Sequence, residues 1–131
     1  MTTAIICTAI LAALLFLLGA NVSRMRGVQD KAGGPQLPTD PADRLLIAIR
    51  AHGNAAEYVP TLIVLFLLVG HRGPAAVAIP LIVGATLARL LHAYGLLTAP
   101  TLAKQTVLRA VGAGGTYLFG VALAVATVFT L

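Results

Sequence analysis

One short stretch of the sequence carries most of the side chains that could bind a polar ligand. Residues 50–60 read RAHGNAAEYVP and open an apolar run that continues to Val69. The stretch supplies a cation, an imidazole, an amide and a carboxylate. Four polar side chains recur at i, i+4, i+7 and i+11, which places them in one narrow stripe on a helix: Arg50, Asn54, Glu57 and Thr61. His52 falls on roughly the opposite side of that helix, and Tyr58 flanks the stripe.

This polar stripe lies in a segment that is apolar enough to enter a membrane. A central Arg or Asp costs about 2.5–3.5 kcal/mol on insertion scales, so charged groups in a span face a protein interior or a water-filled cavity. We therefore expect the polar stripe to point into a helix bundle. There it either binds a ligand or holds an ion pair between Arg50 and Glu57.

The composition indicates an integral membrane protein. Of the 131 residues, 59% are hydrophobic and 10% are charged, and the mean hydropathy is +0.95. A soluble domain has about 25% charged residues. The length leaves room for about four spans of roughly 20 residues each in one domain.

The net charge of +5 does not indicate a nucleic-acid partner. The basic residues are scattered over helix ends and one loop, and they form no basic face. Cys7 is the single cysteine and lies in the first apolar run, where a small apolar filler is the expected role. No group of His, Cys, Asp and Glu has metal-ligand spacing, so we expect no metal site.

Four apolar segments predict four spans, at about residues 3–20, 42–69, 75–97 and 102–131. Residues 27–43 contain a Gly-Gly-Pro triplet and further prolines, and this density predicts a surface loop. Pro60 and Pro80 lie inside the second and third spans, where each predicts a kink. Short turns between later spans favour antiparallel neighbours. The expected fold is an all-α four-transmembrane-helix bundle over residues 1–131.

The basic residues beside the spans predict the orientation in the membrane. Those at the first and third loops outnumber those at the second: Arg24, Arg26, Lys31, Arg44 and Lys104 against His71 and Arg72. The positive-inside tendency then puts the first and third loops in the cytoplasm and both termini outside. Charged groups on three spans fall in the half nearest those loops, which is a sign of a shared site: Arg50, Glu57, Arg89 and Arg109.

Residues 50–60 resemble the second-helix signature of the MAPEG family, the membrane-associated proteins in eicosanoid and glutathione metabolism. That signature is an Arg-Ala-His/Gln-x-Asn-x-x-Glu-x-x-Pro string. Residues 88–95, ARLLHAYG, look like the third-helix end of the small bacterial members. Residues 109–116, RAVGAGGT, look like their fourth-helix Arg-x-x-Gly-x-x-x-Thr. The length and the order of the four spans agree over the whole chain.

The resemblance implies a left-handed bundle that assembles as a homotrimer in a bacterial inner membrane. It implies a glutathione site between subunits, open to the cytoplasm. The second-helix residues that would contact glutathione are Arg50, His52, Asn54, Glu57 and Tyr58. Arg24 or Arg26 would contribute from the end of the first helix. Arg89 and His92 share a face of the third span and complete the candidate set, and Arg109 would stabilise the thiolate.

The chemistry of glutathione agrees with these residue types. Its two carboxylates need cations, and the guanidinium forks of Arg50 and Arg89 suit carboxylates. Its amine needs an anion, which Glu57 supplies. Its thiol, with a pKa of about 8.5, reacts as the thiolate, which a nearby guanidinium favours. Arg109 lies on a face of small residues with Thr116, and a lipophilic second substrate would enter from the bilayer.

The expected function is a glutathione-dependent membrane transferase or peroxidase acting on lipophilic electrophiles. A non-catalytic family member that binds a lipid or a protein partner is the first alternative, because family enzymes often carry Tyr where this chain has His92 and Leu96. A small transporter is the second, although inverted repeats are not visible. Structural roles also compete at single residues: His52 at a subunit contact, Arg89 in a buried pair, and the glycines after Arg109 in close helix packing.

Overall fold

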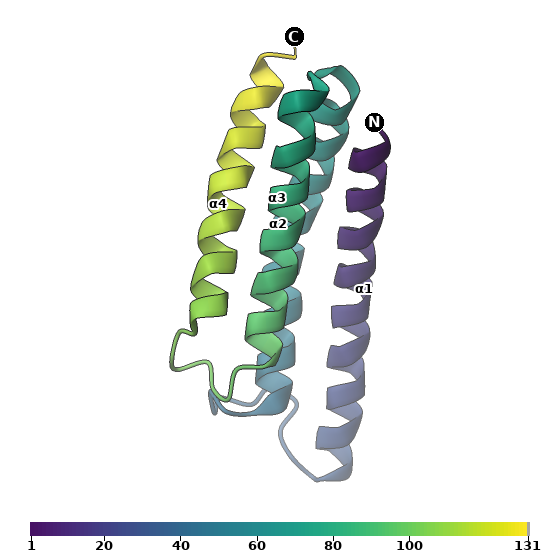
Figure 1. Cartoon of the computed structure of the whole chain (residues 1–131). Coiled ribbons are helices and arrows are strands. Elements are labelled where there is room, and N and C mark those ends of the chain that lie inside the picture. The colour runs from purple at the N-terminus through teal and green to yellow at the C-terminus, as the bar shows by residue number, and fades with distance from the viewer. Residues whose placement is uncertain (131) are drawn as a thin grey trace.

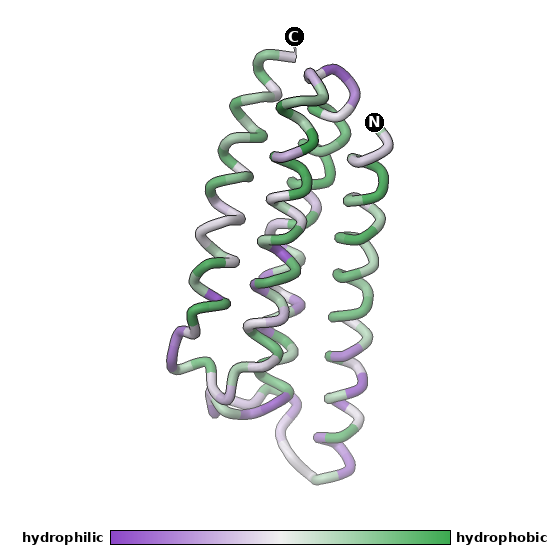
Figure 2. The backbone as a smooth tube through the Cα atoms, in the orientation of Figure 1, coloured by the Kyte–Doolittle hydropathy of each residue, from purple (hydrophilic) through white to green (hydrophobic). Residues whose placement is uncertain are grey.

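The computed structural model describes residues 1–130, which form four α-helices. These are α1 (Thr2–Lys31), α2 (Arg44–Arg72), α3 (Ala75–Leu97) and α4 (Val107–Val128). The helices run up and down, so both termini lie at one end and the 32–43 and 98–106 loops at the other (Figure 1). All four are long and apolar enough to cross a membrane. Figure 2 shows the hydrophilic residues gathered mainly toward the ends, as expected of an integral membrane protein.

The four helices pack as two hairpins. The most extensive packing joins α3 to α4 and α1 to α2, and α2 joins the two hairpins through α3. Within the described residues α1 and α4 do not touch, and they lie on opposite sides of the bundle (Figure 1). The two middle helices therefore form the centre of the fold.

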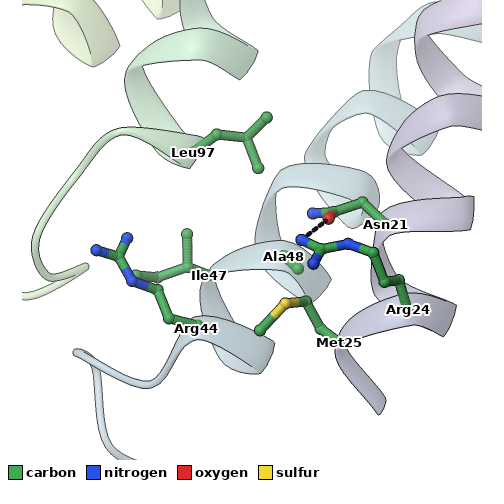
Figure 3. Close-up of a pocket in the computed structure, with 7 residues that line it drawn as sticks. All are labelled: Asn21, Arg24, Met25, Arg44, Ile47, Ala48 and Leu97. Atoms are coloured by element: carbon green, nitrogen blue, oxygen red, sulfur yellow. Dashed lines mark hydrogen bonds between the residues drawn. The ribbon is translucent and has the colours of Figure 1, made fainter. Parts of the chain in front are cut away.

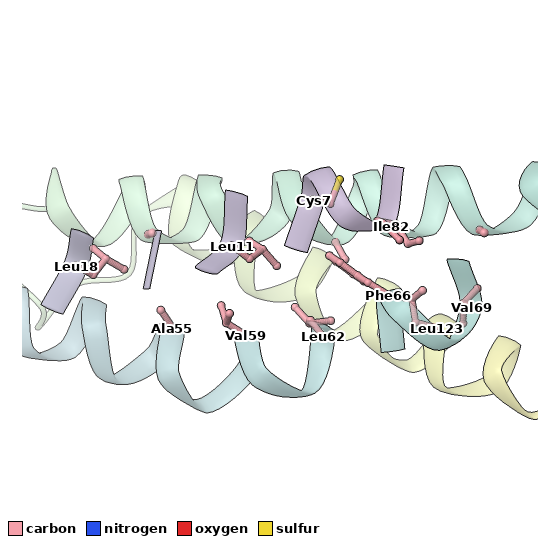
Figure 4. Close-up of a cluster of buried hydrophobic side chains, with 14 of the residues drawn as sticks. Cys7, Leu11, Leu18, Ala55, Val59, Leu62, Phe66, Val69, Ile82 and Leu123 are labelled. Atoms are coloured by element: carbon pink, nitrogen blue, oxygen red, sulfur yellow. The ribbon is translucent and has the colours of Figure 1, made fainter. Parts of the chain in front are cut away.

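One apolar face of α2 builds the core. Its buried residues recur every three or four positions, which is the spacing of one helix face: Ala51, Ala55, Val59, Leu62, Phe66 and Val69. This face meets Leu11 and Leu18 of α1, Ile82 of α3 and Leu123 of α4 (Figure 4).

Side-chain caps set where two helices begin. The Asp43 carboxylate accepts from the backbone N–H of Leu45 at 2.7 Å and starts α2. The Thr106 hydroxyl accepts from the backbone N–H of Arg109 at 3.4 Å and starts α4. Such caps satisfy donors that have no partner inside the helix.

Two predicted boundaries were wrong. Residues 27–31, which were assigned to the loop, continue α1. A helix can extend beyond the membrane into water, and α1 ends only before the glycines at 33 and 34 and the proline that follows them. The segment from 102 to 106 is not helical. The Leu102 N–H donates instead to the Pro41 carbonyl at 2.8 Å and ties the two loops together. Pro60 and Pro80 lie inside continuous helices, and their kinks and the membrane limits stay predictions.

Candidate functional site

A buried arginine on α3 is the centre of the polar residues inside the bundle. Arg89 is 1% exposed, and its Nη2 donates to Asn54 Oδ1 of α2 at 2.8 Å. Its Cζ lies 5.2 Å from the centroid of the Tyr58 ring, also on α2, which is within the range of a cation–π contact. The structure thus brings three of the predicted site residues together.

A fourth residue, Tyr117 of α4, completes this cluster. The Tyr58 and Tyr117 hydroxyls lie 3.4 Å apart, and the two ring centroids are separated by 5.9 Å. The sequence reasoning missed Tyr117, although it directly follows the fourth-helix segment that ends at Thr116. An aromatic hydroxyl within an apolar helix was the available signal. We call Asn54, Tyr58, Arg89 and Tyr117 the arginine cluster.

No carboxylate among residues 1–130 forms a salt bridge with Arg89. Its partners are a neutral amide and an aromatic face, and its Nε is buried without a hydrogen-bond partner. A buried guanidinium keeps its charge and retains donor capacity for a further acceptor. The arginine cluster is therefore suited to an anionic group.

Three of the four residues of the polar stripe do not point into the bundle of their own chain, and their burial in a larger assembly stays a prediction. Arg50, Glu57 and Thr61 are exposed on the single chain, and only Asn54 is partly buried. The reason is that the opposite, apolar face of α2 takes the interior position. No ion pair joins Arg50 to Glu57 in the described part of the chain, so the stripe is open to a ligand or to a second chain.

A second contact joins α3 to α4 at His92. Its Nδ1 lies 2.9 Å from the Arg109 carbonyl. Because a carbonyl only accepts, Nδ1 carries the proton and Nε2 is the acceptor of the neutral ring. The Arg109 guanidinium donates from Nη1 to the Lys104 carbonyl at 2.7 Å, and its Nε is buried without a partner. The His92 ring thus contacts Arg109 through the Arg109 backbone carbonyl.

Glycines allow this close approach of α3 and α4. A Cβ atom at Gly112 would lie 2.6 Å from the backbone N of His92, and one at Gly95 would lie 2.9 Å from the backbone N of Arg109. Gly114, by contrast, has open space around it. The Thr116 hydroxyl donates to the Gly112 carbonyl of its own helix at 2.8 Å, so its proton is not available to a ligand.

The remaining predicted site residues lie elsewhere on the chain. Arg24 and Arg26 are exposed near the end of α1, and Arg24 donates to Asn21 Oδ1 at 3.0 Å. His52 is half-buried and faces α1, where its Nε2 would lie 3.3 Å from a Cβ at Gly19. The single chain therefore does not gather all the candidates at one point.

The bundle and its polar residues define a small integral membrane protein with four helices that can span the bilayer. Comparison with protein-family models matches residues 4–129 to the MAPEG family, so the chain belongs to that family. Comparisons with curated proteins and with solved structures gave no match. The resemblance inferred from residues 50–60 is confirmed, and it places the protein among membrane proteins of glutathione and eicosanoid metabolism.

Proposed function

We propose that this protein is a glutathione-dependent membrane transferase or peroxidase that acts on lipophilic electrophiles. The observation that carries the proposal is membership of the MAPEG family over residues 4–129, together with an intact second-helix string at residues 50–60. The arginine cluster supports it, because its guanidinium is buried without a carboxylate partner.

The proposal includes a homotrimer with glutathione bound between subunits. Arg50 and Glu57 are exposed on a helix that is otherwise apolar, and charged groups facing lipid are costly. A neighbouring copy of the chain would cover the polar stripe and place it at a polar contact between subunits. The family resemblance supplies the number of subunits, and native mass spectrometry in a mild detergent tests it.

The binding roles follow from charge. Arg50 and Arg89 hold the carboxylates of glutathione, with Arg24 or Arg26 from the end of α1. Glu57 binds the amine. Further polar side chains orient the peptide: His52, Asn54, Tyr58 and His92. The site opens to the cytoplasm, with both termini outside a bacterial inner membrane.

Arg109 is the proposed catalytic residue. Its guanidinium stabilises the thiolate after the thiol proton has passed to water, and the sulfur then forms a bond to the electrophilic carbon while the leaving group departs. Its Nε is buried without a partner and retains a donor for the sulfur. Removing the guanidinium should raise the pKa of the bound thiol toward its free value of about 8.5.

A groove beside the arginine cluster supports a lipophilic second substrate. It has a volume of about 450 Å³, lies between α2 and α4, and is lined by apolar surface. Tyr58 and Tyr117 line it, together with Leu65 and Val121. A substrate dissolved in the bilayer can reach such a groove without crossing water.

Glutathione binding and thiolate absorption test the proposal. We expect the purified protein in detergent to bind glutathione and to show the ultraviolet absorption of a thiolate at a pH below 8.5. Arg109→Ala should keep binding and lose that absorption at the same pH. Arg50→Ala and Glu57→Ala should weaken binding instead. Failure of the wild type to bind glutathione would refute the proposal.

A non-catalytic family member is the second candidate function. The observation that favours it is the position of His92, whose Nδ1 is engaged by the Arg109 carbonyl, and of Leu96, which is buried and apolar. Neither presents the hydroxyl that family enzymes often carry there. Glutathione binding without any thiolate signal in the wild type would favour this second function.

A further inference from the structure

A cavity at the loop end of the bundle shares only Arg24 with the residues proposed to bind glutathione. Its volume is about 400 Å³, and it lies between the loop-side ends of α1, α2 and α3. The lining residues come from all three helices: Asn21, Arg24, Met25, Arg44, Ile47, Ala48 and Leu97. Figure 3 shows Arg24 and Arg44 on opposite sides, with Leu97 above.

The two arginines bring positive charge to this cavity without a carboxylate. Arg24 Nη2 donates to Asn21 Oδ1 at 3.0 Å, and Arg44 Nη1 donates to the Ala99 carbonyl at 3.4 Å. Both acceptors are neutral. Each guanidinium has five N–H donors, so most of them are available to a ligand. A planar guanidinium fork matches the oxygens of a phosphate group.

The rest of the wall is apolar, which restricts the kind of ligand. Met25, Ile47, Ala48 and Leu97 provide hydrophobic side chains between and above the two arginines. A free inorganic anion would gain nothing from contact with these apolar side chains. An amphiphile with an anionic head and hydrocarbon attached to it would contact both parts.

The place of the cavity along the helices fits a lipid headgroup. Arg44 is the first residue of α2, directly after the 32–43 loop, so the cavity lies where the span meets the polar region of the bilayer. Ala48 precedes Asn54 by six residues, which is about 9 Å along a helix. The cavity is therefore below the arginine cluster, and Arg50 lies on another face of α2.

We propose that this cavity binds the phosphate group of an anionic phospholipid, held between Arg24 and Arg44. Basic pockets between membrane helices bind such headgroups in general. The proposal goes beyond the glutathione function and does not depend on it. It assigns Arg24 to the lipid, which leaves Arg26 as the arginine of α1 available to glutathione.

The test compares two variants, each of which lacks one positive charge of α2. Wild type, Arg44→Gln and Arg72→Gln are purified in detergent, and native mass spectrometry measures retention of phosphatidylglycerol and of phosphatidylcholine. Arg72 ends α2 at the opposite side of the membrane and is exposed like Arg44, so it is the matched control. Circular dichroism confirms equal helix content.

We expect the wild type to retain phosphatidylglycerol over phosphatidylcholine. Arg44→Gln should lower that retention about fivefold, and Arg72→Gln should leave it unchanged. Equal retention of the two lipids, or an equal loss in both variants, would overturn the proposal. Displacement by millimolar inorganic phosphate with no lipid preference would assign the site to soluble phosphate and overturn the lipid assignment. Glutathione binding by Arg44→Gln, measured in parallel, keeps this result separate from the proposed function.

Discussion

Gly112 brings the backbone of α4 against the backbone of α3, and its replacement by alanine gives a sharp test of this packing. The new Cβ would lie 2.6 Å from the backbone N of His92 and 2.7 Å from its Cα. Ordinary van der Waals contact begins at 3.4 Å. Both contacted atoms belong to the main chain, so a side-chain rotation cannot relieve the clash and the two helices must separate.

The expected loss of stability is the difference between two opposing effects. Inserting a methyl group into a close contact typically costs about 1–3 kcal/mol. Alanine also favours the helix over glycine by about 0.5–1 kcal/mol. Gly114 on the same helix has nothing within 4 Å of its Cβ position, so Gly114→Ala should show the helix gain alone. The two variants should therefore differ by about 1–3 kcal/mol.

Thermal unfolding in detergent, followed by circular dichroism, measures this difference. On the order of 4 °C in melting temperature corresponds to 1 kcal/mol for a chain of this size. We expect Gly112→Ala to melt at least about 4 °C below Gly114→Ala, with both variants in the same oligomeric state by size-exclusion chromatography. A Gly112→Ala variant that melts as high as Gly114→Ala would refute the close approach of α3 and α4 at His92.

Four further outcomes are expected. Asn54→Ala should lower stability by about 1.5–3 kcal/mol in the same melting assay, because the buried Arg89 charge loses its hydrogen-bond acceptor; an unchanged melting temperature would contradict the contact. Tyr58→Leu should destabilise more than Tyr58→Phe, since only the first removes the ring beside the guanidinium, and equal melting curves would argue against that contact. Thr106→Ala should cost about 0.5–2 kcal/mol by removing the cap of α4, and no loss would place the start of the helix elsewhere. Arg109→Ala should shift the thiolate titration of bound glutathione to higher pH, and an unchanged titration would remove Arg109 from the catalytic role.

The helices and their order could be predicted from the sequence because a span must satisfy both length and hydropathy. The extension of α1 past residue 26 could not, because helical backbone bonds form in water as well as in lipid. The start of α4 depends on Thr106, a cap that the apolar pattern does not reveal.

Most residues of the candidate site could be predicted from the sequence, but the residues that each of them contacts could not. Periodicity identified the polar stripe, yet it does not say whether a face meets the interior of its own chain or a second chain. Charge alone favoured a pair between Arg50 and Glu57, whereas Arg89 takes Asn54 as its partner. Tyr117 was missed because its contact with α2 depends on the rotation of α4 about its axis, which a single sequence does not determine.

The division of the bundle into two hairpins has a consequence for how the protein can be taken apart and rebuilt. A chain cut at Gly73 would give two membrane hairpins, α1 with α2 and α3 with α4. They would rejoin through the contacts of α2 with α3 and α4 and of α1 with α3. The arginine cluster is shared across that cut: Asn54 and Tyr58 belong to the first half, and Arg89 and Tyr117 to the second. Neither fragment could build the cluster alone, so an anion bound at Arg89 would act as a reporter that two co-expressed halves had found each other in the bilayer.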